Sequence, residues 1–235
     1  MTSEGSEYDQ LFYPSLFEGG TASAEEVLEQ VRYSTVEKCR ETITLRQQML
    51  EQSWEQMIAA ARALAQAFAH GATLLAFGNG GSATDVQDLV GELRFPPFAD
   101  ARPLPALALT NEAAIITAVA NDVGVENIFA RQIIAFGQQG DIALGISTSG
   151  NSPNMLRAFE QARAQGLLTI GLAGYGGGKM ARSPVLDFCL VTPGEHIPRI
   201  QEAQATVYHA LLELTFALLC RQEDRPEREI DEICG

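Results

Sequence analysis

Two loops rich in glycine, serine and threonine have the residue types best suited to binding chemistry in this 235-residue chain. The first lies in LLAFGNGGSATD at residues 74–85, and the second lies in DIALGISTSGNSPN at residues 141–154. In each, an apolar run typical of a buried parallel strand ends in a polar loop, and a helical pattern follows. Glycines let backbone N–H groups approach a ligand, hydroxyls donate hydrogen bonds, and a helix N-terminus attracts negative charge. Together the two loops predict a site for one phosphorylated ligand.

A second group of residues has side chains that transfer protons or bind metals. Asp88 and Glu92 follow the first loop and are four residues apart, so on a helix both carboxylates project from one face. Gln201 and His209 lie in the last helical stretch, where about 100° per residue puts them within roughly 80° of each other. Two structural interpretations stay open at this point. The carboxylates could form a solvated acidic face, and His209 could be a hydrogen-bonded structural residue.

The elements that must position these residues alternate between short apolar runs and helical stretches. This alternation predicts right-handed βαβ crossovers and a doubly wound parallel sheet. Ligands of such sheets bind at the carboxyl ends of the strands, near a switch in strand order, and both loops fall at such ends. The predicted strands are 73–77, 105–109, 142–146, 168–172 and 188–191, and the last helix is predicted over 198–221.

The N-terminal third has the composition of a helical region rather than alternating strands and helices. Residues 24–70 are rich in Ala, Gln, Glu, Leu and Arg and contain no Gly or Pro, which predicts helix. Because this length exceeds that of an ordinary globular helix, we expect two or three helices, whose apolar positions could build a subunit interface. The expected organisation is an N-terminal extension (1–23), one α/β domain with its helices (24–222) and an acidic tail (223–235). The extension could be an arm on a neighbouring subunit or a partly disordered leader.

Composition narrows the class of protein. A net charge of −14 argues against an extended nucleic-acid interface, although backbone N–H groups can still hold a small phosphate. The four cysteines form no CxxC pair, so we interpret them as reduced thiols rather than as a disulfide framework or zinc finger. We find neither a signal peptide nor a membrane-spanning stretch, which predicts a cytoplasmic protein without membrane contact.

Five sequence blocks resemble those of one family. They are GNGGS followed by a helix with Glu92, AND at 120–122, GDIALGISTSGNSPN at 140–154, GGKMA at 177–181 and RIQEAQ…H at 199–209. In order and spacing, over roughly residues 30–220, they are similar to the SIS-domain phosphoheptose isomerases (sedoheptulose 7-phosphate isomerases). The resemblance implies a three-layer α/β/α sandwich with a flavodoxin-like five-stranded parallel sheet. It also implies a homotetramer with active sites at subunit interfaces.

The same resemblance implies a reaction and a set of site residues. The reaction is the isomerisation of sedoheptulose 7-phosphate to D-glycero-D-manno-heptose 7-phosphate. Glu92 and His209 correspond to the catalytic pair, and Gln201 matches a glutamine that contacts metal or substrate. The implied phosphate-binding residues are Ser147, Thr148, Ser149 and Ser152, and the other implied substrate-binding residues are Asn79, Gly80, Gly81, Ser82, Asn121 and Asp122.

Two departures from the family pattern concern metal and substrate. Family members often bind zinc through a histidine four residues before the glutamate, together with the glutamate, the glutamine and the later histidine. Here Asp88 stands at the position of that first histidine. The implied set of Asp88, Glu92, Gln201 and His209 is therefore oxygen-rich, which leaves open zinc, another divalent ion or none. In addition, Pro96 stands where the family has an arginine, and the nearest arginine is Arg94.

The chemistry can also be argued from the residues. Moving a carbonyl from C2 to C1 requires a base that abstracts a weakly acidic proton and an acid near the carbonyl oxygen. A desolvated Glu92 is suited to the first task, and His209 to the second near neutral pH. One alternative is a non-catalytic tetrameric SIS-domain adaptor for a protein partner, of the replication-initiation-regulator type. A sugar-phosphate-sensing regulator is a third possibility, but residues 1–70 show no recognition helix for DNA.

Overall fold

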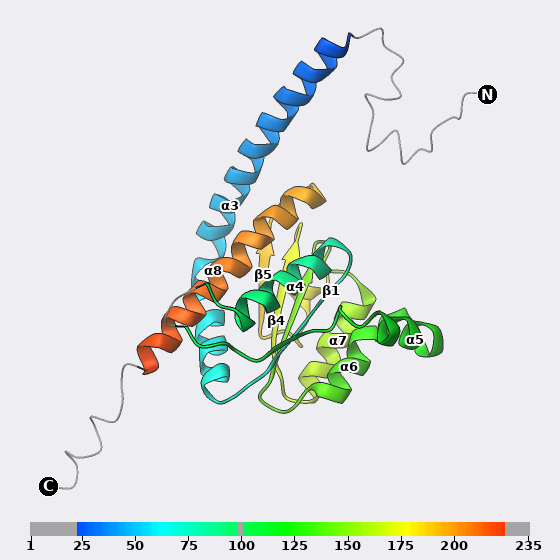
Figure 1. Cartoon of the computed structure of the whole chain (residues 1–235), viewed down its shortest axis with the longest axis vertical. Coiled ribbons are helices and arrows are strands. Elements are labelled where there is room, and N and C mark those ends of the chain that lie inside the picture. The colour runs from blue at the N-terminus through cyan, green and yellow to red at the C-terminus, as the bar shows by residue number, and fades with distance from the viewer. Residues whose placement is uncertain (1–22, 98–100, 224–235) are drawn as a thin grey trace, which may run out of the picture. The chain divides into compact units, whose positions relative to one another are not determined.

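A five-stranded, all-parallel sheet forms the centre of the protein (Figure 1). The structure, a computed structural model, describes residues 23–97 and 101–223. The strand order is β2-β1-β3-β4-β5, which is the predicted flavodoxin-like order. All five predicted strands are confirmed, with ends that differ from the prediction by at most two residues. The strands are β1 (Leu74–Gly78), β2 (Ala106–Ala108), β3 (Ile142–Ser147), β4 (Leu168–Gly174) and β5 (Phe188–Thr192).

Helices connect the strands and cover the sheet. Two short 3₁₀ turns, Val125–Asn127 (η1) and Met180–Arg182 (η2), interrupt the connections. The last helix is three residues longer than the predicted 198–221, since it runs from Ile197 to Glu223. The helices are α3 (Ala24–Ala69), α4 (Gly81–Arg94), α5 (Ala113–Val123), α6 (Ile128–Phe136), α7 (Pro153–Ala164) and α8 (Ile197–Glu223).

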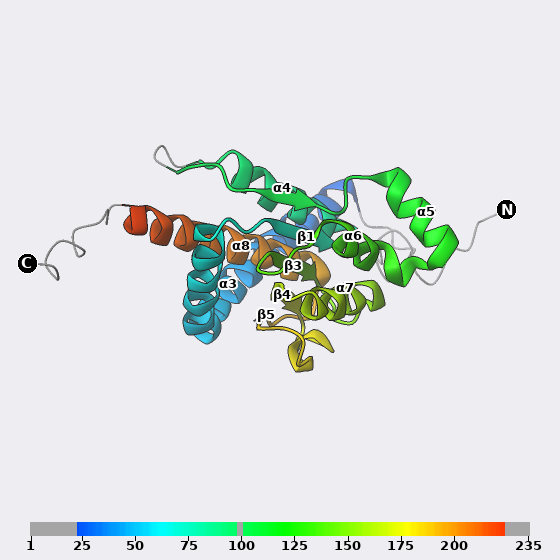
Figure 2. The same ribbon diagram turned by 90° about the horizontal axis from the view of Figure 1, so that it is seen from below.

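The core has two parts, one on each face of the sheet, because side chains alternate along a strand. On β1, Leu74 and Ala76 belong to the cluster that includes apolar residues of α4, α8 and the part of α3 from Glu41 onward. Leu75 and Phe77 face the opposite way and pack with residues of α6 and α7. Phe77 contacts Phe159 of α7 with ring centroids 5.0 Å apart. The result is the predicted three-layer α/β/α sandwich (Figure 2).

The expectation of two or three helices over residues 24–70 is wrong. A single helix of 46 residues, α3, runs from Ala24 to Ala69. Its start is a capping box: the Ser23 hydroxyl accepts from the Glu26 N–H at 3.2 Å, and the Glu26 carboxylate accepts from the Ser23 N–H at 2.7 Å. The helix ends before Gly71, whose φ is +85°. Since no Gly or Pro lies between these signals, nothing in the local sequence interrupts the helix.

The strand order explains why the two predicted binding loops are neighbours. β1 pairs with β2 on one side and β3 on the other, and Gly78 lies opposite Ile146 in the register of β1 and β3. The chain therefore changes direction across the sheet between β1 and β3, and a crevice opens at the carboxyl ends of two such strands. The loops that follow Gly78 and Ser147 lie on either side of that point.

Helix α8 is long and apolar enough to cross a membrane by length and composition, over Ile197–Arg221. Half of that stretch is buried inside the structure, and its apolar residues belong to the core on one face of the sheet. α8 is therefore a core helix of the α/β fold.

The described chain divides into two compact units between Arg40 and Glu41. The expected boundaries 1–23, 24–222 and 223–235 stay predictions, because residues 1–22 and most of the acidic tail lie outside the described residues. Among the described residues, Cys39, Cys189 and Cys220 are free thiols, as the sequence predicted for them, while Cys234 lies outside the described residues.

Candidate active site

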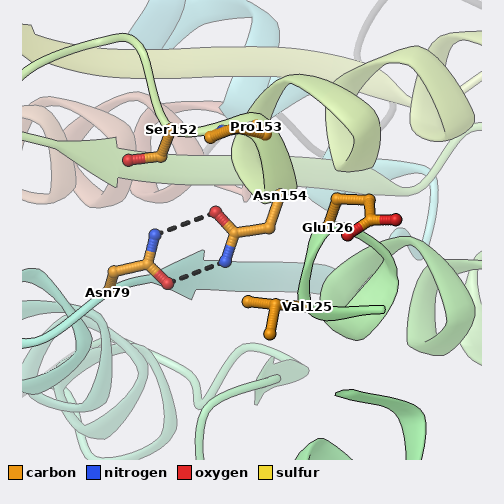
Figure 3. Close-up of a pocket in the computed structure, with 6 residues that line it drawn as sticks. All are labelled: Asn79, Val125, Glu126, Ser152, Pro153 and Asn154. Atoms are coloured by element: carbon orange, nitrogen blue, oxygen red, sulfur yellow. Dashed lines mark hydrogen bonds between the residues drawn. The ribbon is translucent and has the colours of Figure 1, made fainter. Parts of the chain in front are cut away.

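The two glycine-rich loops meet through a pair of asparagines. Asn79 follows β1 and Asn154 lies in the first turn of α7, and their amides exchange two hydrogen bonds of 3.0 and 2.8 Å (Figure 3). Each amide donates once and accepts once, so the pair fixes the spacing between the loops. A cavity of about 340 Å³ opens beside the pair. It is lined by Asn79, Val125, Glu126, Ser152, Pro153 and Asn154.

Both loops use glycine where a side chain would be strained. Gly80 has φ +56°, and Gly150 has φ +62°. A Cβ on Gly150 would also collide with the carbonyl oxygen of Gly177, which is backbone and cannot rotate away. The Gly80 turn starts α4, and the Gly150 turn leads into α7 with Pro153 at its first position. Both turns therefore require glycine.

The second loop is also held by its own hydroxyl groups. The Ser147 hydroxyl accepts from the Gly150 N–H at 3.1 Å, and the Ser149 hydroxyl accepts from the Asn151 N–H at 3.2 Å. The Asn151 side chain accepts from the Lys179 N–H at 3.0 Å, which ties the loop to the GGGK segment. A hydroxyl that accepts one hydrogen bond still has its proton to donate. The loop is thus ordered while its donors stay available to an anion.

A cluster of two carboxylates and one imidazole lies between α4 and α8. Nε2 of His209 is 3.0 Å from Oε1 of Glu92 and 3.5 Å from Oδ2 of Asp88. The side chain of Glu92 keeps 28% of its accessible surface, that of His209 46% and that of Asp88 56%. Glu92 is therefore the most shielded of the three. His209 is half exposed despite its apolar flanking residues.

Tyr208 adds a hydrogen bond to this cluster. Its hydroxyl donates to Oδ2 of Asp88 at 2.8 Å, and its ring lies against the His209 ring with centroids 4.4 Å apart. Burial raises the pKa of Tyr208 well above its ordinary value, and the hydrogen bond to the Asp88 carboxylate raises it further. The phenol is therefore a neutral donor at physiological pH.

Gln201 lies near the start of α4, at the other end of this row of polar groups. Its side chain occupies the space that a Cβ on Gly81 would need, and it hydrogen-bonds Asp85. The pKa of Asp85 is raised by burial, and the hydrogen bond to Gln201 opposes that shift. Since Gln201 contacts the first turn of α4 and His209 contacts later turns, the two helices run in the same direction.

Three other predicted site residues lie on α5 and at the start of α4. Asn121 and Asp122 are exposed on α5, where the Asn121 amide donates to the Asp122 carboxylate at 2.8 Å. Ser82 is buried at the start of α4. Arg94 does not replace the arginine missing at Pro96, because its guanidinium donates to the Ala106 carbonyl of β2.

The cluster fits a divalent metal ion. One ligand atom from each of Asp88, Glu92 and His209 can be chosen so that all three lie within 4.8 Å of one another. An imidazole nitrogen with two carboxylate oxygens is a donor set that Zn²⁺ and other divalent ions accept. Asp88, which stands at the position of the family's histidine, is thus one of the three possible ligands. Gln201, the fourth predicted ligand, stays a prediction.

Sequence reasoning missed three residues of this region. Asp85 precedes Asp88 and Glu92 by three and seven residues, so its helical spacing was a usable signal. No such signal marked Tyr208 or Asn154. Tyr208 contacts Asp88 and Asn154 contacts Asn79, and both partners are distant in the sequence. Only the packing of α8 and α7 brings those partners together.

Comparisons with known proteins agree with this fold. The sequence profile of the SIS domain matches residues 39–174. The phosphoheptose isomerase of Nitratidesulfovibrio vulgaris (strain Miyazaki F) is 40% identical over 187 residues, which are 80% of this chain and 89% of the relative. That of Aquifex aeolicus is 39% identical over 183 residues, covering 78% and 95% of the two chains. The solved phosphoheptose isomerase of Neisseria gonorrhoeae superposes with a TM-score of 0.72 at 33% identity, covering 81% of this chain and 99% of that one.

These matches confirm the family resemblance and the fold class that the sequence predicted. The chain belongs to the SIS-domain family of phosphoheptose isomerases, which are sugar-phosphate isomerases.

Proposed function

We propose that this chain converts sedoheptulose 7-phosphate to D-glycero-D-manno-heptose 7-phosphate through an enediol(ate). The observation that carries the proposal is the 3.0 Å contact between Glu92 and His209, a carboxylate and an imidazole from different helices. Ketose–aldose isomerisation needs such a pair, one group to move the proton on carbon and one to move the proton on oxygen. Relatives 40% identical to the chain are named phosphoheptose isomerases, which supports the choice of substrate.

In this proposal the second loop anchors the phosphate. Hydroxyls at the N-terminus of α7 favour an anion, and a fixed loop converts phosphate binding into orientation of the sugar. The phosphate-binding residues would be Ser147, Thr148, Ser149 and Ser152, and the sugar would contact Asn79, Gly80, Gly81, Ser82, Asn121, Asp122 and Gln201.

Glu92 then acts as the base on carbon. It takes the proton from C1 of the ketose, which gives the C1=C2 double bond of the enediol(ate). When Glu92 returns the proton to C2, the electrons of that double bond form the new C2–H bond, and the C1 oxygen loses its own proton and becomes the carbonyl oxygen. His209 moves the proton between the two oxygens, a role that suits imidazole near neutral pH. A base and an acid placed in this way each contribute roughly 10²–10⁴-fold to the rate.

Asp88, Glu92 and His209, with Gln201, would hold a divalent ion, zinc being the family's usual metal. When bound there, the ion would polarise the substrate carbonyl and stabilise negative charge on its oxygen. Asp88 contributes a second negative charge to the cluster, which favours a divalent cation over none.

We further propose a cytoplasmic homotetramer with active sites at subunit interfaces. Two large apolar side chains are exposed: Phe95, three residues after Glu92 in the sequence, at 83%, and Val125, which lines the cavity, at 60%. Apolar surface of this kind marks interaction sites. A neighbouring subunit would cover this surface and exclude water from the partly exposed Glu92 and His209.

The test is incubation of the purified protein with sedoheptulose 7-phosphate, followed by NMR. The expected result is the appearance of the aldose signal, with a rate that falls after chelation and recovers on addition of Zn²⁺. Absence of aldose in both metal-free and metal-supplemented samples would reject the isomerase proposal and favour the adaptor alternative. Mass measurement in solution tests the tetramer separately.

A further inference from the structure

Asp88 stands at a position whose geometry depends on one buried neighbour. Its side chain is 56% exposed, and an exposed carboxylate loses rotamer freedom when it binds an ion. The tyrosine hydroxyl at 2.8 Å removes much of that freedom in advance. A carboxylate has about four lone-pair positions, so this one hydrogen bond leaves Asp88 able to bind a cation.

Tyr208 is itself held rigidly. It is only 3% exposed and belongs to the core that includes Leu211 and Leu212 of α8. A buried tyrosine needs a partner for its hydroxyl, and the carboxylate of Asp88 is that partner. The core therefore fixes the position of the Tyr208 hydroxyl, and the Asp88 side chain adopts the orientation that reaches it.

Tyr208 and His209 are consecutive residues of one helix. α8 thus supplies both the imidazole of the cluster and the hydroxyl that orients Asp88. The rings of Tyr208 and His209 are in contact. Any shift of α8 relative to α4 would displace both together. Groups that hydrogen-bond a metal ligand fix its direction and commonly matter for affinity almost as much as the ligand does.

We propose that Tyr208 is a positioning residue that fixes Asp88 as a ligand for a divalent cation shared with Glu92 and His209. The proposal rests on the metal site of the proposed function and goes beyond it by assigning Tyr208 a role. Asp88 alone would be a mobile surface carboxylate. Asp88 with Tyr208 is a directed ligand that can stand in the place of a histidine.

The test measures the affinity for Zn²⁺ itself, without substrate, by competition with a chromophoric chelator. The variants are Tyr208→Phe, Asp88→Asn, the double variant, and Thr215→Val as a matched control. Thr215 lies two turns further along α8, is fully buried and donates its hydroxyl to the Leu211 carbonyl, so its replacement removes a buried hydroxyl far from Asp88. Thermal unfolding without metal establishes that each variant is folded.

Tyr208→Phe is expected to weaken Zn²⁺ binding by roughly 10–100-fold, the usual cost of losing such a partner. Asp88→Asn should weaken it at least as much, and the double variant should match Asp88→Asn because Tyr208 acts through that carboxylate. Thr215→Val should bind like the wild type. The proposal is overturned if Tyr208→Phe binds normally, or if it loses as much affinity in the Asp88→Asn background as in the wild type.

A wild-type protein that binds no Zn²⁺ would overturn the proposal too, while the isomerase assay judges the proposed function independently. A second measurement covers the case in which Tyr208→Phe does not fold. Zn²⁺ should produce a tyrosine ultraviolet difference spectrum in the wild type that is absent in Asp88→Asn. The same spectrum in both proteins would contradict the role of Tyr208.

Discussion

The carboxylate of Glu92 and the imidazole of His209 come from α4 and α8, far apart in the sequence, and meet at 3.0 Å. Their helices lie side by side and run in the same direction (Figure 1). Substitutions can therefore test the separate proton-transfer roles proposed for Glu92 and His209.

Glu92→Gln should lower kcat by at least 10²-fold, because the amide is nearly isosteric but cannot accept the substrate proton. Substrate affinity, measured by calorimetry, should change little, since the phosphate loop is untouched. Glu160→Gln on α7 is the matched control, because Glu160 is an exposed residue that pairs with Arg157, which is also exposed, on the same helix. Normal turnover in Glu92→Gln would show that another group is the base.

Ser149→Ala should mainly weaken the binding of phosphorylated ligands. Loss of one hydrogen bond to a charged group costs about 1.5–3 kcal/mol, or roughly 10–150-fold in Kd. Binding is best measured in the Glu92→Gln background, where the ligand does not turn over. Unphosphorylated sedoheptulose is the control ligand, and its affinity should stay the same. Equal losses for both sugars would remove phosphate recognition from the role of Ser149.

Gly150→Ala should destabilise the protein more than Gly140→Ala. Both glycines have positive φ, which costs alanine about 1–2 kcal/mol. At Gly150 the added methyl also meets the Gly177 carbonyl, whereas the described residues leave open space around Gly140. Urea unfolding should therefore give a loss for Gly150→Ala that is larger by about 1 kcal/mol or more. Similar losses would mean that the contact with Gly177 relaxes without cost.

Cys189 should react slowly with iodoacetamide at pH 8. Burial raises the pKa of its thiol to about 11, so the thiolate population at pH 8 is about a thousandth. The rate should increase roughly tenfold per pH unit between pH 8 and 10, because only the thiolate reacts and the pH stays below the pKa. Peptide-resolved mass spectrometry measures it, with exposed Cys39 as the internal control. Labelling of Cys189 as fast as that of Cys39 at pH 8 would contradict the shift.

Local patterns were enough to predict the sheet and the loops. Fully buried parallel strands such as β1 have continuous apolar sequences, and glycine indicates the turns that follow them. The prediction was wrong for α3. It divided the stretch into two or three helices because of its length, although no residue in it interrupts a helix. Helix ends depend on stop signals such as Gly71, and the stretch before it contains none.

The sequence by itself determined which residues have the chemistry and which of them share a helix face, as with Asp88 and Glu92, because helical spacing is a local property. Only the tertiary structure decided which distant groups meet. It set His209 against Glu92, Tyr208 against Asp88 and Asn79 against Asn154, since the packing of α8 on α4 and of the loops at the sheet edge depends on a core assembled from the whole domain. Contacts across helices are selected by that packing, and no single segment encodes them.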